Sequence, residues 1–139
     1  MGRHVYWCPM RWSDMDVQGH INNSAFMVYL EQARIDLFFG QATAAGVGTI
    51  AQGVVVARHE IDYRRPVLYS AQPLRIDLWC RQIKGASFRA AYEIYDGDVL
   101  AVQAQTLCVP YDLEAGRVRR LSPAERSFIE QYLDEQYLD

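Results

Sequence analysis

The organisation of this chain is decided by the stretch Arg11-Trp-Ser-Asp-Met-Asp-Val-Gln-Gly-His-Ile-Asn-Asn23. It holds two carboxylates, a glycine, a histidine and two asparagines, and it ends where an apolar pattern of helical spacing begins. The start of a helix offers unpaired backbone N–H groups and the positive end of the helix dipole, which both stabilise negative charge. These titratable groups beside a helix start make the stretch the candidate place for chemistry.

The residues that follow predict one long central helix over 24–39. The apolar residues at helical spacing are Phe26, Leu30, Ala33 and Leu37, flanked by Met27 and Phe38. Asn22, Asn23 or Ser24 can cap the start of this helix, and Gly40 is its expected stop. Because it is the longest apolar helix of the chain, we expect it to be central rather than peripheral.

Strand-like segments surround this helix in the sequence. They cover residues 4–12, 54–63, 74–83, 87–95 and 99–109. The short connections Lys84-Gly85 and Asp96-Gly97-Asp98 predict that the last three strands pair as antiparallel hairpins. Pro9 indicates an edge strand or a bulge in the first strand, since proline cannot donate to a ladder. Apolar and polar residues alternate over 74–81, which is typical of a sheet with one buried face.

The order of elements predicts an α+β fold in a single domain over residues 1–139. An antiparallel sheet of about five strands would wrap around the long helix and so bury it. The sequence Ser122-Pro-Ala-Glu125 is a capping box that opens a further helix at the C-terminal end. The free edges of such a sheet favour pairing with a second copy of the chain.

Composition excludes several classes of function. The formal net charge of −3 argues against nucleic acid as the main partner. No run approaches the roughly 20 apolar residues of a membrane span, and no signal-peptide core is present, so we expect a cytoplasmic protein that does not enter membranes. Cys8, Cys80 and Cys108 lack CxxC spacing and are expected to be reduced, buried thiols. No metal-ligand spacing appears, and no cofactor is expected.

The quoted stretch, with Tyr29-Leu-Glu-Gln-Ala-Arg34 on the next helix, resembles the hotdog-fold acyl-CoA thioesterases. It looks most like the 4-hydroxybenzoyl-CoA thioesterase-like branch, and it is also similar to the matching loop of plant acyl-ACP thioesterases. The element order agrees over essentially the whole chain. The resemblance implies hydrolysis of an acyl-CoA to a free acid and CoA. It also implies a homodimer or homotetramer with sheets joined edge to edge and active sites at the dimer interface.

The resemblance assigns roles within the loop. The second aspartate is the catalytic carboxylate of this branch and falls on Asp16, and the backbone N–H that polarises the thioester carbonyl falls near Asn23. The plant enzymes add a polar residue and a histidine, which match Gln18 and His20. A carboxylate can attack the carbonyl to give a mixed anhydride or can deprotonate a water, and the sequence is compatible with both routes.

Other residues receive supporting roles. The further expected substrate contacts are Gly19, Asn22 and Phe26 around the helix start, with Arg64 and Lys84 for the phosphates of CoA. Asp14 is expected to be structural and to bond loop N–H groups. Glu31, which can pair with Arg34, is an alternative catalytic carboxylate, because some hotdog enzymes keep theirs on the central helix. His59 is expected to be structural.

Two alternative functions stay open. The first is an enoyl-thioester hydratase or dehydratase on the same fold, whose usual motif separates the Asp and His by four residues and contains Asn-Pro. Here three residues separate Asp16 from His20, and no proline follows Asp16. The second is a non-catalytic acyl-CoA-binding protein, although such regulators usually add a DNA-binding segment. The acyl group is left open, as is the choice between CoA and acyl-carrier protein.

Overall fold

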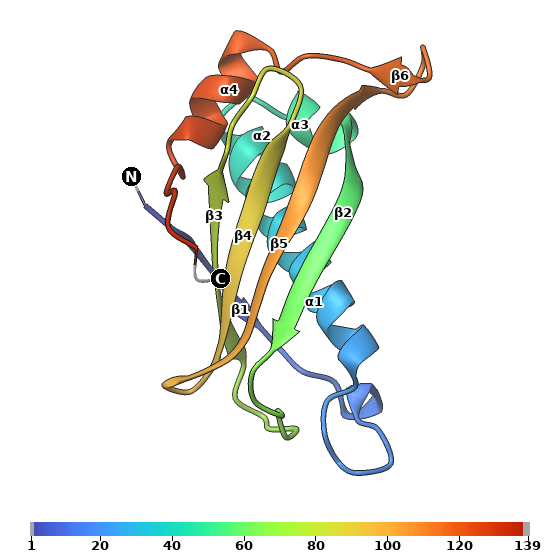
Figure 1. Ribbon diagram of the computed structural model, residues 1–139, viewed down its shortest axis with the longest axis vertical. Coiled ribbons are helices and arrows are strands. Elements are labelled where there is room, and N and C mark those ends of the chain that lie inside the picture. The colour runs from blue at the N-terminus through green and yellow to red at the C-terminus, as the bar shows by residue number, and fades with distance from the viewer. Residues whose placement is uncertain (1, 138–139) are drawn as a thin grey trace.

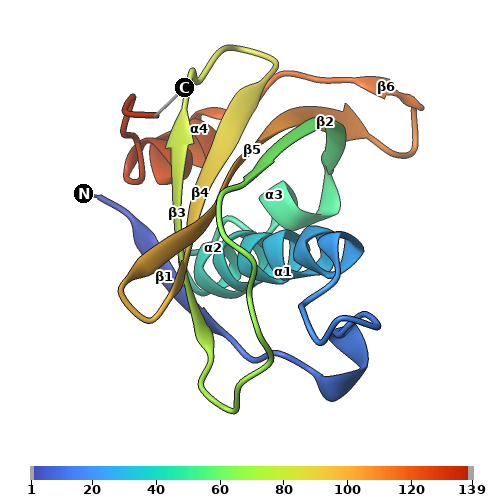
Figure 2. The ribbon, with the colours of Figure 1, turned by 60° about the horizontal axis from the view of Figure 1, so that its bottom comes forward.

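A curled antiparallel sheet wraps around one long helix in the computed structural model, which describes residues 2–137 (Figures 1 and 2). The strands are β1 (His4–Cys8), β2 (Val54–Tyr63), β3 (Leu74–Arg81), β4 (Phe88–Asp96), β5 (Val99–Asp112) and β6 (Arg117–Val118). The helical segments are η1 (Trp12–Asp14), α1 (Asn23–Ile35), η2 (Asp36–Gln41), α2 (Ala42–Ala44), α3 (Thr49–Gln52) and α4 (Pro123–Glu130). The predicted fold class is confirmed. Within residues 2–137, no helix combines the length and apolar composition that a bilayer crossing requires.

The apolar stripe of α1 faces the concave side of the sheet. Phe26, Leu30, Ala33 and Leu37 are all buried, as the helical spacing predicts. They share one core with alternate residues of the central strands, namely Leu74, Ile76, Leu78, Cys80, Ala90, Tyr92, Ile94, Val102 and Ala104. Each large side chain buried in this way stabilises the fold by roughly 1.5–3 kcal/mol.

The central helix continues past its predicted stop at Gly40. From α1 the chain passes directly into the π-helical turn η2 and then through α2 to Ala44. Consecutive Leu37 and Phe38 are both buried in this wider turn. A glycine inside a helix costs only about 1 kcal/mol, which burial of these side chains outweighs. The helical run ends instead at Ala44, shortly before Gly46, whose φ of +82° lies in the left-handed region that favours glycine.

The order of strands in the sheet is β1-β3-β4-β5-β2. The predicted hairpins β3–β4 and β4–β5 are present, and β1 lies at one edge, as Pro9 indicates. β2 does not pair with the next strand in sequence; it lies beside β5 at the opposite edge. Among residues 2–137, no strand pairs with the outer side of β2. This free edge lies next to α1.

A β-bulge interrupts β2 between Val56 and Arg58. Cross-strand partners point to the same face of a sheet, so Val56 shares the helix side with Cys108, and His59 shares it with Thr106. In an unbroken strand, strict alternation would turn His59 away from the helix if Val56 faces it. The bulge shifts the alternation by one residue, so Val56 and His59 both face the helix. Residues at both ends of β2 can consequently line cavities beneath the sheet.

The outer face of the sheet is better covered than the alternation over 74–81 predicts. Trp79 lies on the expected polar side, yet it is buried. The Arg3 guanidinium stacks on the Trp79 ring at 3.6 Å from the ring centroid, and the indole N–H donates to the Gln136 carbonyl (3.0 Å). Arg3, which precedes β1, and the C-terminal tail thus cover this part of the sheet, a long-range contact that residue alternation does not encode.

The three cysteines are buried, as the sequence predicts. Burial raises the pKa of the Cys8 thiol to about 11 and that of the Cys108 thiol to about 12. A thiolate is the reactive form of cysteine, so these protonated thiols are inert at neutral pH.

Helix α4 begins at the predicted capping box. The Ser122 hydroxyl accepts from the Glu125 N–H (3.1 Å), and the Glu125 carboxylate accepts from the Ser122 N–H (2.8 Å). This buried carboxylate also accepts from the Arg119 guanidinium (2.8 Å) and the Thr49 hydroxyl (2.8 Å). Burial alone raises the pKa of Glu125, but the donors outweigh burial and lower it to about 2. One carboxylate thus joins α3, α4 and the chain that follows β6.

Glu125→Gln is expected to lower the free energy of unfolding by about 3 kcal/mol at neutral pH. The reason is that the partly buried Arg119 guanidinium would lose the carboxylate with which it pairs. A depressed pKa stabilises the fold above the ordinary carboxyl pKa of 4.5, and this contribution is lost as the pH falls toward 2. Urea unfolding should therefore show a smaller difference between the two proteins at about pH 3 than at neutral pH. The exposed Glu114→Gln is the control, and a difference independent of pH would contradict the assignment.

Candidate active site

The stretch that the sequence singles out forms a tight loop between η1 and α1, drawn in blue at the bottom of Figure 1. The Asp16 N–H donates to the His20 carbonyl (2.8 Å), and the Gly19 N–H donates to the Asp16 carbonyl (3.1 Å). Gly19 has a φ of +80°, a left-handed conformation that a side chain would strain. The Ile21 N–H donates to the Val67 carbonyl (2.7 Å), which attaches the loop to the segment after β2.

Asp14 anchors this loop to the helix. Its buried carboxylate accepts from the Tyr29 hydroxyl (2.6 Å), the Arg11 backbone N–H (3.1 Å) and the Arg11 guanidinium (3.0 Å). Burial alone raises the pKa of Asp14, but these donors outweigh it and the net pKa is lowered. Burial and the neighbouring carboxylate both raise the pKa of Tyr29. Asp14 therefore has the structural surroundings that the sequence predicts for it.

Asp16 lies two residues further on in a different environment. Its Oδ1 accepts from the backbone N–H groups of Gln18 (2.9 Å) and His20 (3.3 Å), as in an Asx-turn. Among residues 2–137, no group donates a hydrogen bond to the other carboxylate oxygen, Oδ2. One oxygen therefore fixes the orientation of the carboxylate, and the other is available to a ligand or a water.

The start of α1 has a side-chain cap, and within the described residues it also has one backbone N–H without an acceptor. Asn22 is the N-cap, and its Oδ1 accepts from the Ser24 N–H (3.0 Å) and the Ser24 hydroxyl (3.1 Å). In the part of the chain that the structure describes, no acceptor bonds the Asn23 N–H. The Tyr63 hydroxyl donates to the Asn23 carbonyl (3.0 Å) and ties the helix start to the end of β2.

A cavity of about 260 Å³, the catalytic-loop cavity, lies beside this helix start. It is lined by Asp16, Gln18, His20, Ile21, Asn23, Phe26, Tyr63, Arg64, Arg65, Pro66 and Val67. The loop supplies a carboxylate and an imidazole, the helix supplies a backbone donor, and the end of β2 supplies the opposite wall. Gly19 and Asn22 do not line the cavity; they hold the turn and the cap behind it.

The wall at residues 63–67 was only partly expected from the sequence. Tyr63, Pro66 and Val67 were not expected at the site, because they reach the loop only through tertiary contacts. Arg64 was expected as a phosphate ligand, and its guanidinium donates to the Gln103 side chain (2.6 Å).

Lys84 lies away from this cavity. It occupies the turn between β3 and β4, at the opposite end of the sheet from the loop (Figure 1), where its N–H donates to the Ser87 carbonyl (2.7 Å). Lys84 does not line the catalytic-loop cavity of its own chain, and its contact with the substrate stays a prediction. A turn signal predicts a hairpin but not the end of the sheet at which the hairpin lies. Among residues 2–137, no three His, Cys, Asp or Glu side chains form a group that could hold a metal ion.

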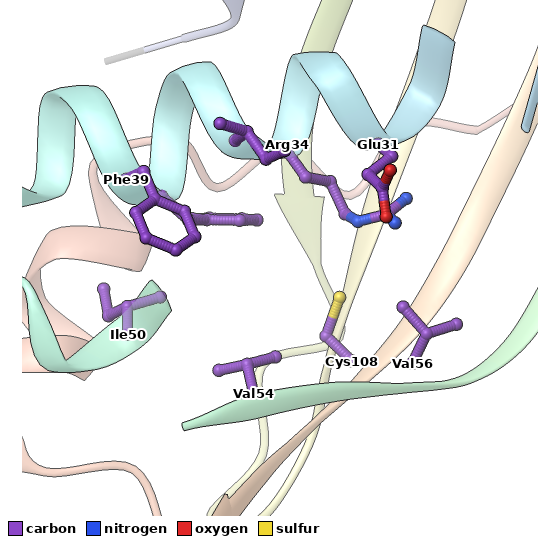
Figure 3. A pocket seen from close by; sticks show the side chains of 9 residues that line it. Glu31, Arg34, Phe39, Ile50, Val54, Val56 and Cys108 are labelled. Carbon is purple, nitrogen blue, oxygen red and sulfur yellow. The ribbon is translucent and has the colours of Figure 1, made fainter. Parts of the chain in front are cut away.

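A second cavity, the α1–β2 cavity, has a volume of about 250 Å³ and lies between the helix and the beginning of β2 (Figure 3). It is lined by Glu31, Arg34, Ile35, Phe38, Phe39, Ile50, Val54, Val56 and Cys108. The predicted pairing of Glu31 with Arg34 is not seen; the Arg34 guanidinium donates to the Tyr92 hydroxyl instead (3.1 Å). His59 is half-buried with its ring nitrogen 2.8 Å from the Thr106 hydroxyl, in keeping with its predicted structural role.

Comparison with known proteins gives one consistent result. A family model described as the thioesterase-like superfamily matches residues 10–131. The structure of a predicted thioesterase from Bacillus stearothermophilus shares the fold, with a TM-score of 0.87 and 20% identity over 98% of this chain and 100% of that one. A thioesterase from Thermus thermophilus, complexed with coenzyme A and Zn, is 27% identical over 92% of each chain, with a TM-score of 0.78. No curated protein matches the chain in sequence.

Tyr29→Phe tests the anchor of the loop. The change removes one donor from the buried Asp14 carboxylate, so the free energy of unfolding is expected to fall by about 1–3 kcal/mol. The pKa of Asp14 should rise, because a bond to its charged form is lost. Urea unfolding and NMR titration of the carboxyl carbon measure these changes, with Tyr69→Phe as a partly exposed control. Unchanged stability in Tyr29→Phe would show that the loop is held by other contacts.

Proposed function

The chain belongs to the thioesterase-like superfamily, and on this basis we propose that it hydrolyses an acyl-CoA to a free carboxylic acid and CoA, with Asp16 at the reacting centre. The family assignment establishes a thioester hydrolase. Coenzyme A in the related Thermus thermophilus structure supports CoA as the carrier. The observation that carries the proposal is one cavity that is lined by both Asp16, with its available carboxylate oxygen, and Asn23, with its available N–H.

In the proposed mechanism the thioester carbonyl binds at the start of α1. The Asn23 N–H donates to the carbonyl oxygen and stabilises the negative charge that develops when the carbonyl carbon is attacked. The positive end of the helix dipole adds to this stabilisation. The hydrogen bond from Tyr63 to the Asn23 carbonyl supports the proposal, because it holds the helix start against the wall of the cavity.

Asp16 acts on the carbonyl carbon by one of two routes. As a nucleophile, its carboxylate forms a mixed anhydride and expels the CoA thiolate, and water then hydrolyses the anhydride. As a general base, it takes a proton from a water that attacks the carbonyl directly. Either route consumes one water, and the leaving thiolate takes up a proton. The available Oδ2 supports both routes, since each needs an oxygen that the loop does not occupy.

The surrounding residues orient the reacting groups. The backbone N–H groups of Gln18 and His20 fix the Asp16 carboxylate, and their side chains contact the thioester end of the substrate. Phe26 forms an apolar wall, and Arg64 lies where it can approach the carrier. The remaining predicted contacts are assigned indirectly. Gly19 and Asn22 position the loop and the cap, and Lys84, which does not line the cavity of its own chain, is assigned to CoA bound at a second copy.

The proposal includes a homodimer or homotetramer with active sites at the dimer interface. The free outer edge of β2 supports it, because an unpaired strand is a template for another strand. Val55 and Val56 are exposed along this edge, as an edge covered by a second copy would require. The cytoplasmic location stays a prediction from the sequence.

Asp16→Asn tests the reacting group. Asparagine keeps the size of the side chain and an oxygen for the loop N–H groups, but it is neither a nucleophile nor a base. Release of CoA from a panel of acyl-CoAs, followed with a thiol reagent, should fall by about 10³-fold or more. The control is Asp98→Asn, which changes an exposed carboxylate in the turn between β4 and β5.

Three other outcomes would redirect the assignment. Turnover that survives Asp16→Asn would move the chemistry to Glu31 or His20. Acyl-CoA binding without any turnover would favour the non-catalytic binding protein. Loss of enoyl absorbance in place of CoA release would favour the hydratase.

Asn23→Pro tests the backbone donor. Proline has no N–H, yet it is well tolerated at the first position of a helix. The preceding Asn22 is already extended, with a ψ of 144°, as a residue before proline must be. We expect kcat to fall by about 10²-fold while the helix and the stability are retained. Asn23→Ala, which keeps the N–H, should retain activity; equal activity in both variants would exclude the donor.

A further inference from the structure

A third cavity, the α1–β1 cavity, lies between the helix and the end of β1 and has a volume of about 190 Å³. It shares no lining residue with the catalytic-loop cavity or the α1–β2 cavity. Tyr6, Cys8 and Pro9 line it from the side of β1, and Val28 lines it from α1. Val28 is 41% exposed, so this largely apolar cavity reaches the surface. The proposed mechanism gives it no role.

A single cation lies at this cavity. Arg11 is the only charged side chain among its lining residues in the described chain, and this side chain is 69% exposed. Its Nε and Nη2 donate to Oδ1 of Asp14 (3.3 and 3.0 Å), and among residues 2–137 no acceptor bonds its Nη1. A guanidinium is a planar fork of N–H donors. The edge formed by Nη1 and Nη2 can therefore bind a second carboxylate while Asp14 remains at the Nε edge.

Gln32 supplies a further donor beside Arg11. It lines the α1–β1 cavity one helical turn after Val28, and in the part of the chain that the structure describes its side-chain amide makes no hydrogen bond. An apolar recess with a guanidinium and an amide beside it suits a small organic carboxylate. The apolar body of such a ligand would fill the recess, and its anion would accept charge-assisted hydrogen bonds.

Two residues of the α1–β1 cavity connect it to the catalytic loop. Arg11 and Tyr29 both line the cavity, and both donate to the buried carboxylate of Asp14. The Asp14 carbonyl also accepts from the N–H of Asn22, the N-cap of α1 (2.9 Å). A carboxylate bound to Arg11 would share the positive charge of the guanidinium with Asp14 and so weaken their ion pair. The loop that carries Asp16 would then be held less firmly.

We propose that the α1–β1 cavity binds a small free carboxylate, the class of product that the proposed reaction releases, and that the bound carboxylate slows turnover from outside the active site. This inference rests on the proposed thioesterase function. At about 30 Å³ for each group of water size, a volume of about 190 Å³ holds about six non-hydrogen atoms. Hexanoate and benzoate therefore match the cavity, with their carbon atoms inside and their carboxylate at Arg11 and Gln32.

Inhibition by these two carboxylates distinguishes the α1–β1 cavity from the active site. A carboxylate that binds beside Asp16 competes with the acyl-CoA and raises KM, whereas one that binds in the α1–β1 cavity lowers kcat. We expect saturating hexanoate or benzoate to lower kcat by about 5-fold. Benzamide, which has the shape of benzoate without its charge, should have little effect.

Three further substitutions test the position of the ligand. Val28→Trp fills the cavity from an exposed position and should abolish the decrease in kcat. Met27→Trp is the matched control and should retain the decrease, because Met27 is 39% exposed on α1 and lines none of the three cavities. Gln32→Glu places an anion beside Arg11 and should raise the benzoate concentration needed for inhibition by about 10-fold.

Binding is measured separately from turnover, by NMR titration of the wild-type protein with benzoate. Amide signals of Val28 and Gln32 should shift, and Val28→Trp should remove the shifts. Purely competitive inhibition, equal inhibition by benzoate and benzamide, or equal inhibition of Val28→Trp and Met27→Trp would overturn the inference. A wild-type protein that hydrolyses no thioester would instead refute the proposed function. Benzoate shifts at Val28 would then still establish the binding site, and their absence would overturn it.

Discussion

Burial of one face of α1 against the concave side of the sheet is the constraint on which the rest of this structure depends. Leu30, Ala33 and Leu37 retain no exposed surface, and the sheet curls around the helix to cover them (Figure 2). The position of the helix follows from this packing, and so does the position of its first turn. The Asn23 carbonyl therefore meets Tyr63 at the end of β2 as a consequence of core packing, not of any contact that the loop makes by itself.

Two carboxylates two residues apart show how environment divides their roles. Asp14 is buried and accepts four hydrogen bonds, from Arg11 and Tyr29, and these keep the loop on the helix. Asp16 is half-buried and uses one oxygen for the loop, which leaves the other available. A buried carboxylate is stable only with a full set of donors, so Asp14 serves the structure, whereas Asp16 keeps an oxygen available for its proposed role.

The free edge and the bulge of β2 connect the fold to the proposed assembly. An exposed edge strand is ordinarily a liability, because it invites pairing with other chains. Here a cavity lies on the helix side at each end of β2. Because of the bulge between Val56 and Arg58, the β2 residues that line the two cavities both face the helix. A second copy that covers this edge would lie beside the catalytic-loop cavity, as the proposed dimer requires. Assembly and substrate binding would then have the same structural origin.

The sequence by itself determined the elements and the loop. The stripe on α1, the cap at Ser122, the β3–β4 and β4–β5 hairpins and the grouping around Asp16 depend on short-range spacing, which periodicity and capping encode. Only the tertiary structure decided the rest: the run of helix past Gly40, the covering of Trp79, the pairing of β2 with β5, the wall at residues 63–67 and the distant place of Lys84. These features depend on contacts between residues far apart in the chain, where burial outweighs local preference and no local pattern records the partner.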